Sequence, residues 1–380
     1  MKLVSIEPTP SPHSMKINVD EELPAGQNHN YKQGDDLRSA PDYIQALFDI
    51  EGVKGIYRVA DFLALERHPK YAWETILPAA RQVFGEEQGE AVGNSGVGQI
   101  PVDAFGEVKV FIQMFRGLPM QVKLEDGEQE QRFGLPQRFL DAAMEASSAS
   151  PNMVMERKWV EQSPRYGPLE EIGETVVDEI TASYDDGRLK KLVKLAFQNE
   201  TEQKGTAKER PSLEMLDDSD WKNRYAALDR LVEPDKEDLP FLAKALKDDK
   251  ASIRRLATAY LGMIEDPDVL PYLYQALQDK VVTVRRTAGD CISDLGFKQA
   301  MPQMTESLKD KNRLVRWRAA MFLYEVGDEN AIPALEAASN DPEFEVRMQV
   351  NLALERIKGG EEAKGSVWSQ MTEATQKKTD

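Results

Sequence analysis

A repeat in the C-terminal half of the chain constrains its fold more than any other feature of the sequence. Segments that start at positions 239, 270, 301 and 332 follow one another 31 residues apart, and each opens with an apolar residue followed by proline. Proline suits the first turn of a helix, where its missing N–H would have no partner. Each segment is therefore expected to begin with a helix.

A second helix is expected in each repeat, after a short turn. In the repeat that starts at Leu270, this helix places five apolar residues on one face at helical spacing. They are Val284, Ala288, Cys291, Ile292 and Leu295. A hairpin of two short helices cannot bury such a stripe alone, so the repeats must stack. The pattern predicts an all-α solenoid.

An Asp followed six residues later by an Arg recurs at the same place in each repeat. The pairs are Asp248 and Arg254, Asp279 and Arg285, Asp310 and Arg316, and Asp341 and Arg347. A further pair upstream, Asp218 and Arg224, indicates a degenerate first repeat. This pattern resembles short HEAT repeats over residues 209–358, a family in which such residues form a ladder along the stack. Because the pair recurs in register, we interpret it as structural rather than catalytic.

The first 85 residues predict a compact α+β domain. Strands are expected at 3–6, 15–19, 55–59 and 62–66, and helices from 39 to about 48 and over 73–83. The order β-β-α-β-β-α is typical of helices packed on an antiparallel sheet.

Two strings in this domain resemble the N-terminal domain of Nfu-type iron–sulfur scaffold proteins. They are EPTPSPHSMK at Glu7–Lys16 and LFDIEGVKGIY at Leu47–Tyr57, the second followed by Asp61-Phe62. The resemblance implies the fold of that domain and a protein-docking role. It does not imply cluster assembly, because those scaffolds hold the cluster in a separate domain through a Cys-x-x-Cys motif that this chain lacks. An Nfu-type domain joined to HEAT repeats resembles the conserved virulence factor C family.

The middle of the chain predicts a second α+β domain, with a topology akin to the first. Its strands are expected at 107–115, 119–124 and 154–160, and its helices at 136–146, 168–183 and 188–198. The predicted fold class is thus α+β N-terminal modules followed by an all-α HEAT-repeat solenoid. The predicted divisions are an Nfu-like domain at 1–85, a linker at 86–100, a second α+β domain at 101–198, a linker at 199–208, five HEAT units at 209–358, and a disordered tail at 359–380.

The charge and cysteine content exclude several functional classes. The formal net charge of −18 disfavours nucleic acid and anionic membranes, which are bound through Lys and Arg. No run approaches the roughly 20 apolar residues of a membrane span, and the N-terminus lacks the apolar core of a signal peptide. The single cysteine, Cys291, cannot form an internal disulfide or fill a thiolate cluster site. These features predict a cytoplasmic protein without a cofactor.

No catalytic or metal site is predicted from the remaining reactive residues. His13 lies beside Ser11 and Ser14 in a proline-rich loop, without a glycine elbow or a placed acid, and is interpreted as a surface histidine. His29 falls in a polar segment that is predicted to be a loop, and His68 precedes Pro69. Cys291 lies on the apolar stripe and is interpreted as an unreactive core residue.

Positions that vary between repeats are the candidate protein-binding residues. Beside the ladder Arg, successive repeats carry Tyr225, Arg255, Arg286, Trp317 and Met348, and Tyr324 follows two turns after Trp317. Second helices line the concave face of a solenoid, so these side chains would form a ridge suited to a protein partner. The alternative is that they pack against the neighbouring first helix.

These observations favour a non-enzymatic scaffold or adaptor that binds protein partners on the concave HEAT face. Its Nfu-like domain suggests a regulatory role or a link to iron–sulfur protein maturation. The alternative is an iron–sulfur cluster carrier or assembly factor, in which Cys291 or the histidines contribute across a dimer. A third hypothesis is an enzymatic site in the middle domain.

Overall fold

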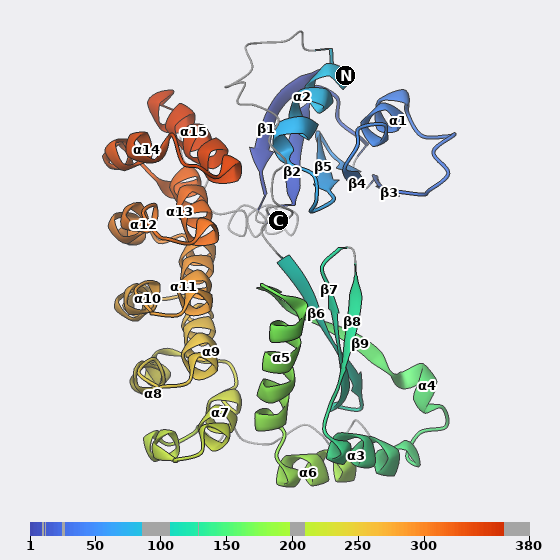
Figure 1. Ribbon diagram of the computed structural model, residues 1–380, viewed down its shortest axis with the longest axis vertical. Coiled ribbons are helices and arrows are strands. Elements are labelled where there is room, and N and C mark those ends of the chain that lie inside the picture. The colour runs from blue at the N-terminus through green and yellow to red at the C-terminus, as the bar shows by residue number, and fades with distance from the viewer. Residues whose placement is uncertain are drawn as a thin grey trace. The chain divides into compact units, whose positions relative to one another are not determined.

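The computed structural model describes residues 1–380 except 10, 12, 25–26, 86–106, 128, 198–209 and 361–380. The predicted linkers, and the predicted tail beyond residue 360, lie outside the described residues. The chain forms two compact units: one contains the N-terminal module and the chain from Leu323 onward, and the other contains the middle module and most of the repeats, up to Phe322. The architecture is α+β followed by helical repeats, as the sequence predicts (Figure 1).

The N-terminal module is a five-stranded antiparallel sheet with two helices. Its strands, in the spatial order β1-β2-β5-β4-β3, are β1 Leu3–Pro8, β2 Ser14–Val19, β3 Asn28–Lys32, β4 Val53–Val59 and β5 Phe62–Arg67. The helices are α1 Asp42–Phe48 and α2 Trp73–Val83. Side chains of β2 and β5 alternate between buried and partly exposed, as expected where one face of a sheet is covered. The core around Trp73 lies on that covered face.

The end of the chain completes the first unit. The last turn of α13 Arg313–Val326 leads through the 3₁₀ turn η6 Glu329–Ala331 into α14 Ile332–Ala338 and α15 Phe344–Lys358. Phe344 and Met348 of α15 pack against the core of the N-terminal module. This module therefore covers one side of the last repeat helix.

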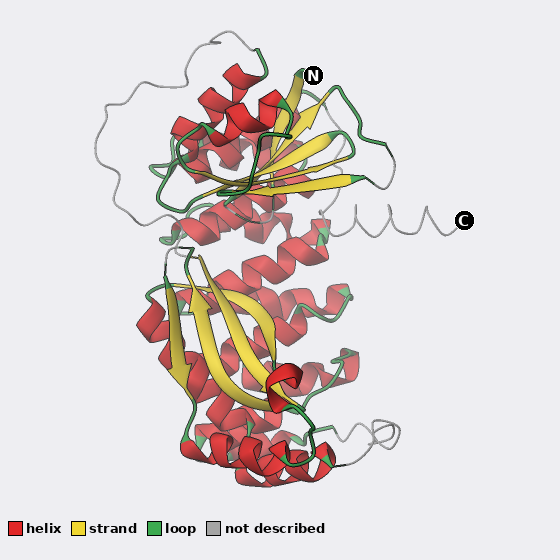
Figure 2. Cartoon of the chain, turned by 90° about the vertical axis from the view of Figure 1, so that its right-hand side faces the viewer, coloured by secondary structure: helices red, strands yellow, loops and turns green. Residues whose placement is uncertain are grey.

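The middle module is built on a four-stranded antiparallel sheet. Its strands, in the order β8-β7-β6-β9, are β6 Glu107–Phe115, β7 Leu118–Glu125, β8 Glu130–Gly134 and β9 Lys158–Tyr166. Its helices are α3 Gln137–Ser147, α4 Met153–Glu156, α5 Leu169–Ser183 and α6 Asp186–Ala196. Apolar residues of β6, β7, α3, α5 and α6 form one core, and Figure 2 shows this sheet face on with helices behind it.

The remaining repeats belong to the second unit. Their first helices are α8 Leu239–Ala245, α10 Leu270–Leu277 and α12 Met301–Ser307, and their second helices are α9 Ala251–Leu261, α11 Val282–Leu295 and α13. Short 3₁₀ turns precede the first helices: η3 Lys236–Asp238, η4 Pro267–Val269 and η5 Lys298–Ala300. Proline occupies the first turn of each first helix, as predicted. The degenerate first repeat consists of η2 Leu213–Asp217 and α7 Trp221–Asp229.

The modules differ from the sequence-based prediction in three places. Strands β3 and β8 were not expected, because both are edge strands with largely exposed, polar sequences that lack apolar alternation. The strand expected at 154–160 is wrong in its first part, where the Asn152 side chain accepts the Met155 N–H and starts α4. The two sheets also differ in strand order, so the expected topological relation between the modules does not hold.

Candidate protein-interaction sites

The Asp–Arg pairs of the repeats form a ladder in the second unit. Three ladder arginines each form a bidentate ion pair with the Asp of the following repeat, with a shorter N···O distance of 2.6–2.7 Å. The pairs are Arg224 with Asp248, Arg254 with Asp279, and Arg285 with Asp310. Each of these Arg side chains also donates to the backbone carbonyl of the Asp in its own repeat. The Asp carboxylate in turn accepts the backbone N–H two residues on, which fixes the turn before the second helix.

The Asp–Arg motif also occurs in the last two repeats, where Arg347 has a different carboxylate partner. Arg316 and Arg347 donate to the carbonyls of Asp310 and Asp341 in their own repeats. The Arg347 guanidinium also pairs with Glu74 of α2 at 3.1 Å. Helix α15 is the last repeat helix within the described residues, and here Glu74 of the N-terminal module takes the place that the Asp of the following repeat has at the earlier rungs. The last ladder Arg is thus used to dock a module.

The residues predicted to form a protein-binding ridge are not exposed. Tyr225, Arg286 and Trp317 retain only 4, 8 and 3% of their accessible surface, and the Arg255 side chain retains 14%. Tyr324 is partly buried. The expectation of an exposed ridge is therefore wrong for the first four residues. Helix α5 of the middle module packs on α7, which carries Tyr225, and its Glu179 pairs with Arg255, while Arg286 lies against Tyr166 of β9.

Glu179 of α5 is the central polar contact between the middle module and the array. Its carboxylate accepts from Arg255 of α9 at 3.1 Å and from Arg165 of β9 at 2.7 Å, and only 5% of the residue is exposed. Burial acts to raise the pKa of the Glu179 carboxyl, but the two arginines outweigh it and leave the pKa below its ordinary value. One buried carboxylate is therefore shared by two cations.

A second contact lies one repeat further along. The guanidinium of Arg286 lies 3.5 Å from the centroid of the Tyr166 ring, and the Tyr166 hydroxyl donates to Glu107 at 3.2 Å. Burial raises the pKa of Tyr166 and of Glu107. Stacking a cation on a buried ring is favourable, so Arg286 contributes to docking of the middle module.

In the first unit, Arg67 has the corresponding role. Its guanidinium pairs with Glu345 of α15 at 3.0 Å, donates to the Tyr71 carbonyl at 2.6 Å, and lies 5.3 Å from the centroid of the Trp73 ring. The residue is 1% exposed. Here the module supplies the buried cation and the repeat helix supplies the carboxylate.

Comparison with known proteins agrees with this three-part organisation. The model of the scaffold protein Nfu/NifU N-terminal domain matches residues 4–89, the model described as Virulence factor matches 113–193, and HEAT-repeat models match 210–289 and 275–355. The protein YpgR of Bacillus subtilis (strain 168) is 60% identical over 99% of this chain and 100% of its own length. Conserved virulence factor C of Staphylococcus aureus (strain MRSA252) is 48% identical over the same shares of the two chains.

The chain belongs to the conserved virulence factor C family. Among solved structures, the crystal structure of Staphylococcus aureus protein SAV1430 matches with 37% identity and a TM-score of 0.21, over 22% of this chain and 99% of that protein.

The histidines and the cysteine of this family member belong to different structural elements. His13, expected on the surface, is buried with 9% exposure, because the loop that carries it packs against β5. His29, expected in a loop, lies in β3 and stacks on Tyr31. The Cys291 thiol donates to the Thr258 carbonyl at 3.5 Å, and burial raises its pKa. The described residues contain no group of three or more His, Cys, Asp or Glu side chains that could hold a metal ion.

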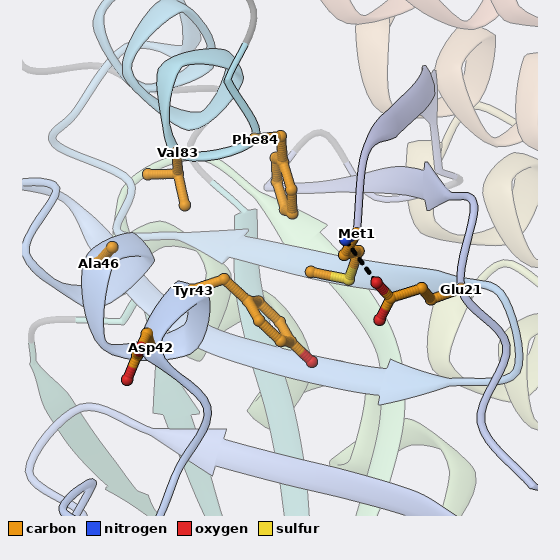
Figure 3. Close-up of a pocket in the computed structure, with 7 residues that line it drawn as sticks. All are labelled: Met1, Glu21, Asp42, Tyr43, Ala46, Val83 and Phe84. Atoms are coloured by element: carbon orange, nitrogen blue, oxygen red, sulfur yellow. Dashed lines mark ion pairs between the residues drawn. The ribbon is translucent and has the colours of Figure 1, made fainter.

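One cavity of about 510 Å³ opens beside α1 and the end of α2 in the N-terminal module. Tyr43 and Phe84 form its walls, and the N-terminal ammonium group forms an ion pair with Glu21 at its rim (Figure 3). Among the described residues that line the cavity, the cationic group is therefore already paired with a carboxylate.

No helix in the described part of this family member is long and apolar enough to cross a membrane.

Proposed function

We propose that the protein is a non-enzymatic scaffold that binds other proteins, and that its repeat array holds two α+β modules in place for this purpose. The contact that supports this proposal most is the buried Glu179 carboxylate, shared by Arg165 and Arg255. An array that uses its second helices to hold its own module leaves the module surfaces and the outer helices for partners. Protein binding is also the usual role of HEAT-type arrays.

The proposed mode differs from binding on the concave face. Tyr225, Arg286 and Trp317 are buried within the chain itself, so a partner that used Tyr225 or Arg286 would have to displace part of the middle module. Displacement of the module from the array would separate the Arg255 guanidinium from the Glu179 carboxylate, at a large cost in free energy. We therefore place the partner contacts elsewhere. The net charge of −18 favours a protein partner over nucleic acid, and the single thiol suits a cytoplasmic location.

A link with iron–sulfur protein maturation is a second candidate, favoured by the match of residues 4–89 to the Nfu/NifU N-terminal model. In this version the N-terminal module docks onto iron–sulfur proteins without carrying a cluster. A single cysteine whose thiol pKa is raised by burial is poorly suited to ligate iron, which is bound as the thiolate.

Capture of partners by the tagged full-length chain, expressed in its own cells, tests the scaffold proposal. We expect the wild-type chain and Glu174→Gln, a substitution on the exposed side of α5, to retain the same partner in near-stoichiometric amount. Glu179→Gln should retain less, because its middle module is held less firmly. Equal retention by all three chains would contradict the proposed role of the docked module.

Anaerobic reconstitution of the purified chain with iron and sulfide distinguishes the cluster-carrier alternative. The scaffold proposal expects no stoichiometric iron. Stoichiometric iron with a visible absorption band that Cys291→Ser abolishes would overturn it.

A further inference from the structure

Helices α3 and α4 of the middle module expose four large apolar side chains. Leu140 and Met144 on α3 are 49 and 59% exposed, and Val154 and Met155 on α4 are 65 and 76% exposed. Five residues, 148–152, separate the two helices. We call these four side chains the α3–α4 patch. Leu140 and Met144 lie four residues apart on the same helix face, adjoining exposed apolar groups mark interaction sites, and methionine adapts readily to a partner's shape.

Helix α3 is unusual in which residues it buries. Its inward face consists of Phe139 and the three small residues Ala142, Ala143 and Ala146. The larger Leu140 and Met144 point outward, although an amphipathic helix normally buries its largest apolar residues. They lie four residues apart, one turn above the other. The module's core does not use them, so their apolar surface is available to another molecule.

A row of negative charge runs beside the apolar row. Asp141 and Glu145 directly follow Leu140 and Met144, and both are exposed. Gln137 donates to the Asp141 carboxylate at 2.9 Å, and neither acid forms an ion pair within the described part of the chain. The outer face of α3 therefore presents an apolar row and an acidic row, side by side and with the same helical spacing.

We propose that the α3–α4 patch binds an amphipathic helix of a partner protein, with apolar residues against the patch and Lys or Arg beside Asp141 and Glu145. This inference rests on the scaffold function proposed above. Two rows at helical spacing match the ridges of another helix better than the alternating side chains of an extended strand. A second copy of this chain is a poor occupant, because its own acidic row and its net charge of −18 would repel.

Site-specific photo-crosslinking in the chain's own cells locates the occupant. Benzoyl-phenylalanine is placed at position 144 of the full-length chain, and at position 263 in a control chain, since Met263 of the array is similarly exposed at 58%. We expect the residue at 144 to crosslink to one segment of a partner, which peptide mapping identifies as a basic amphipathic helix. A crosslink to a second copy, or to an acidic or extended segment, would overturn the proposal.

Binding of that segment, as a synthetic peptide, to the purified full-length chain then tests the chemistry. Leu140→Glu and Met144→Glu should each weaken binding at least tenfold, as expected for central apolar contacts. Paired Asp141→Lys and Glu145→Lys substitutions should weaken binding and reduce its salt dependence. Val232→Glu, at an array residue that is 60% exposed, should leave the affinity unchanged, and all variants should keep the wild-type melting temperature.

The two proposals can fail separately. If tagged chain retains a partner but position 144 gives no more crosslink than position 263, the scaffold function stands and the α3–α4 patch is not its site. If the chain retains no partner at all, both proposals fail.

Discussion

The two α+β modules dock on their repeats through buried ion pairs of opposite polarity. The N-terminal module contributes the cation, Arg67, and the repeat helix contributes Glu345. In the other unit the array contributes Arg255, and the middle module contributes the carboxylate of Glu179 together with a second cation, Arg165. The first site is one cation with one anion, and the second is one anion between two cations.

This difference in stoichiometry predicts a difference in fragility. A buried charge that loses its partner remains desolvated and unpaired, which is more costly than the pair itself is stabilising. Removal of Arg67 leaves the Glu345 carboxylate without this ion-pair partner, and the Glu345 side chain is 13% exposed. Removal of the Glu179 charge leaves two arginines near each other, and burial together with the charge of Arg255 already lowers the pKa of Arg165. The shared site should therefore be the more sensitive of the two.

The largest effect is expected for Glu179→Gln, which keeps the shape of the side chain and removes its charge. We expect a loss of about 3–5 kcal/mol in the free energy of unfolding, measured as a lower urea midpoint followed by circular dichroism. Glu174→Gln, on the exposed side of the same helix, is the matched control and should leave the midpoint unchanged. A loss below about 1 kcal/mol would show that the site relaxes or admits water.

The same effect should depend on pH. A carboxyl whose pKa is lower in the folded state, as that of Glu179 is, stabilises the fold above its unfolded-state pKa, and this contribution disappears as pH falls through the folded value. The stability difference between wild type and Glu179→Gln should be full near about pH 7 and should shrink below about pH 4. Urea midpoints of both chains across this range provide the measurement. A difference that persists in acid would mean that Glu179 acts through packing and not through its charge.

Arg67→Met should have the next largest effect, about 2–3 kcal/mol. Methionine keeps apolar contact with Trp73, but the ion pair with Glu345 and the hydrogen bond to the Tyr71 carbonyl are lost. Arg38→Met is the control, because Arg38 pairs with Asp36 on the surface. If Arg67→Met lowers the urea midpoint more than Glu179→Gln does, the number of partners around a buried charge does not set its cost.

Asp279→Ala measures an internal rung of the ladder, where both partners belong to repeats. Asp279 accepts from Arg254 at 2.6 Å and caps the following turn through the Val281 N–H. We expect a loss of about 1–3 kcal/mol with helical content retained. Asp249, an exposed residue in the preceding repeat, gives a control in Asp249→Ala. An unchanged midpoint for Asp279→Ala would show that the rung contributes nothing to stability.

The array could be predicted from the sequence because its signals repeat. Proline in the first turn, the apolar stripe and the Asp–Arg pair each recur in register, so an error in one repeat is corrected by the others. The helix at 73–83 in the N-terminal module was also predicted with the bounds it has. The edge strands β3 and β8 were not, because an exposed edge needs no apolar alternation.

The docking residues were missed because they depend on contacts distant in sequence. Tyr225, Arg255 and Arg286 look like a free ridge until the middle module is placed against them. A local signal did exist: Glu179 interrupts the apolar face formed by Ile172, Val176 and Ile180 on α5, and Arg67 continues the inward alternation of β5. A charge on an otherwise buried face is seldom accidental. The sequence alone does not supply the partner that explains it.

The smallest effect is expected for Glu74→Gln, which separates the two ways in which the N-terminal module contacts α15. Glu74 and Arg347 form a single contact at 3.1 Å, with side-chain exposures of 40 and 31%, and Arg347 keeps its bonds to the carbonyls of Asp341 and Pro342. A solvent-exposed pair of this kind is worth about 0.5 kcal/mol or less, so the urea midpoint should barely move and any shift should vanish at high salt. Phe344→Ala provides the contrast, because it removes an apolar contact with the module's core and its effect should persist in salt. A larger shift for Glu74→Gln than for Arg67→Met would mean that the exposed rung, and not the buried pair, holds the N-terminal module on the last repeat.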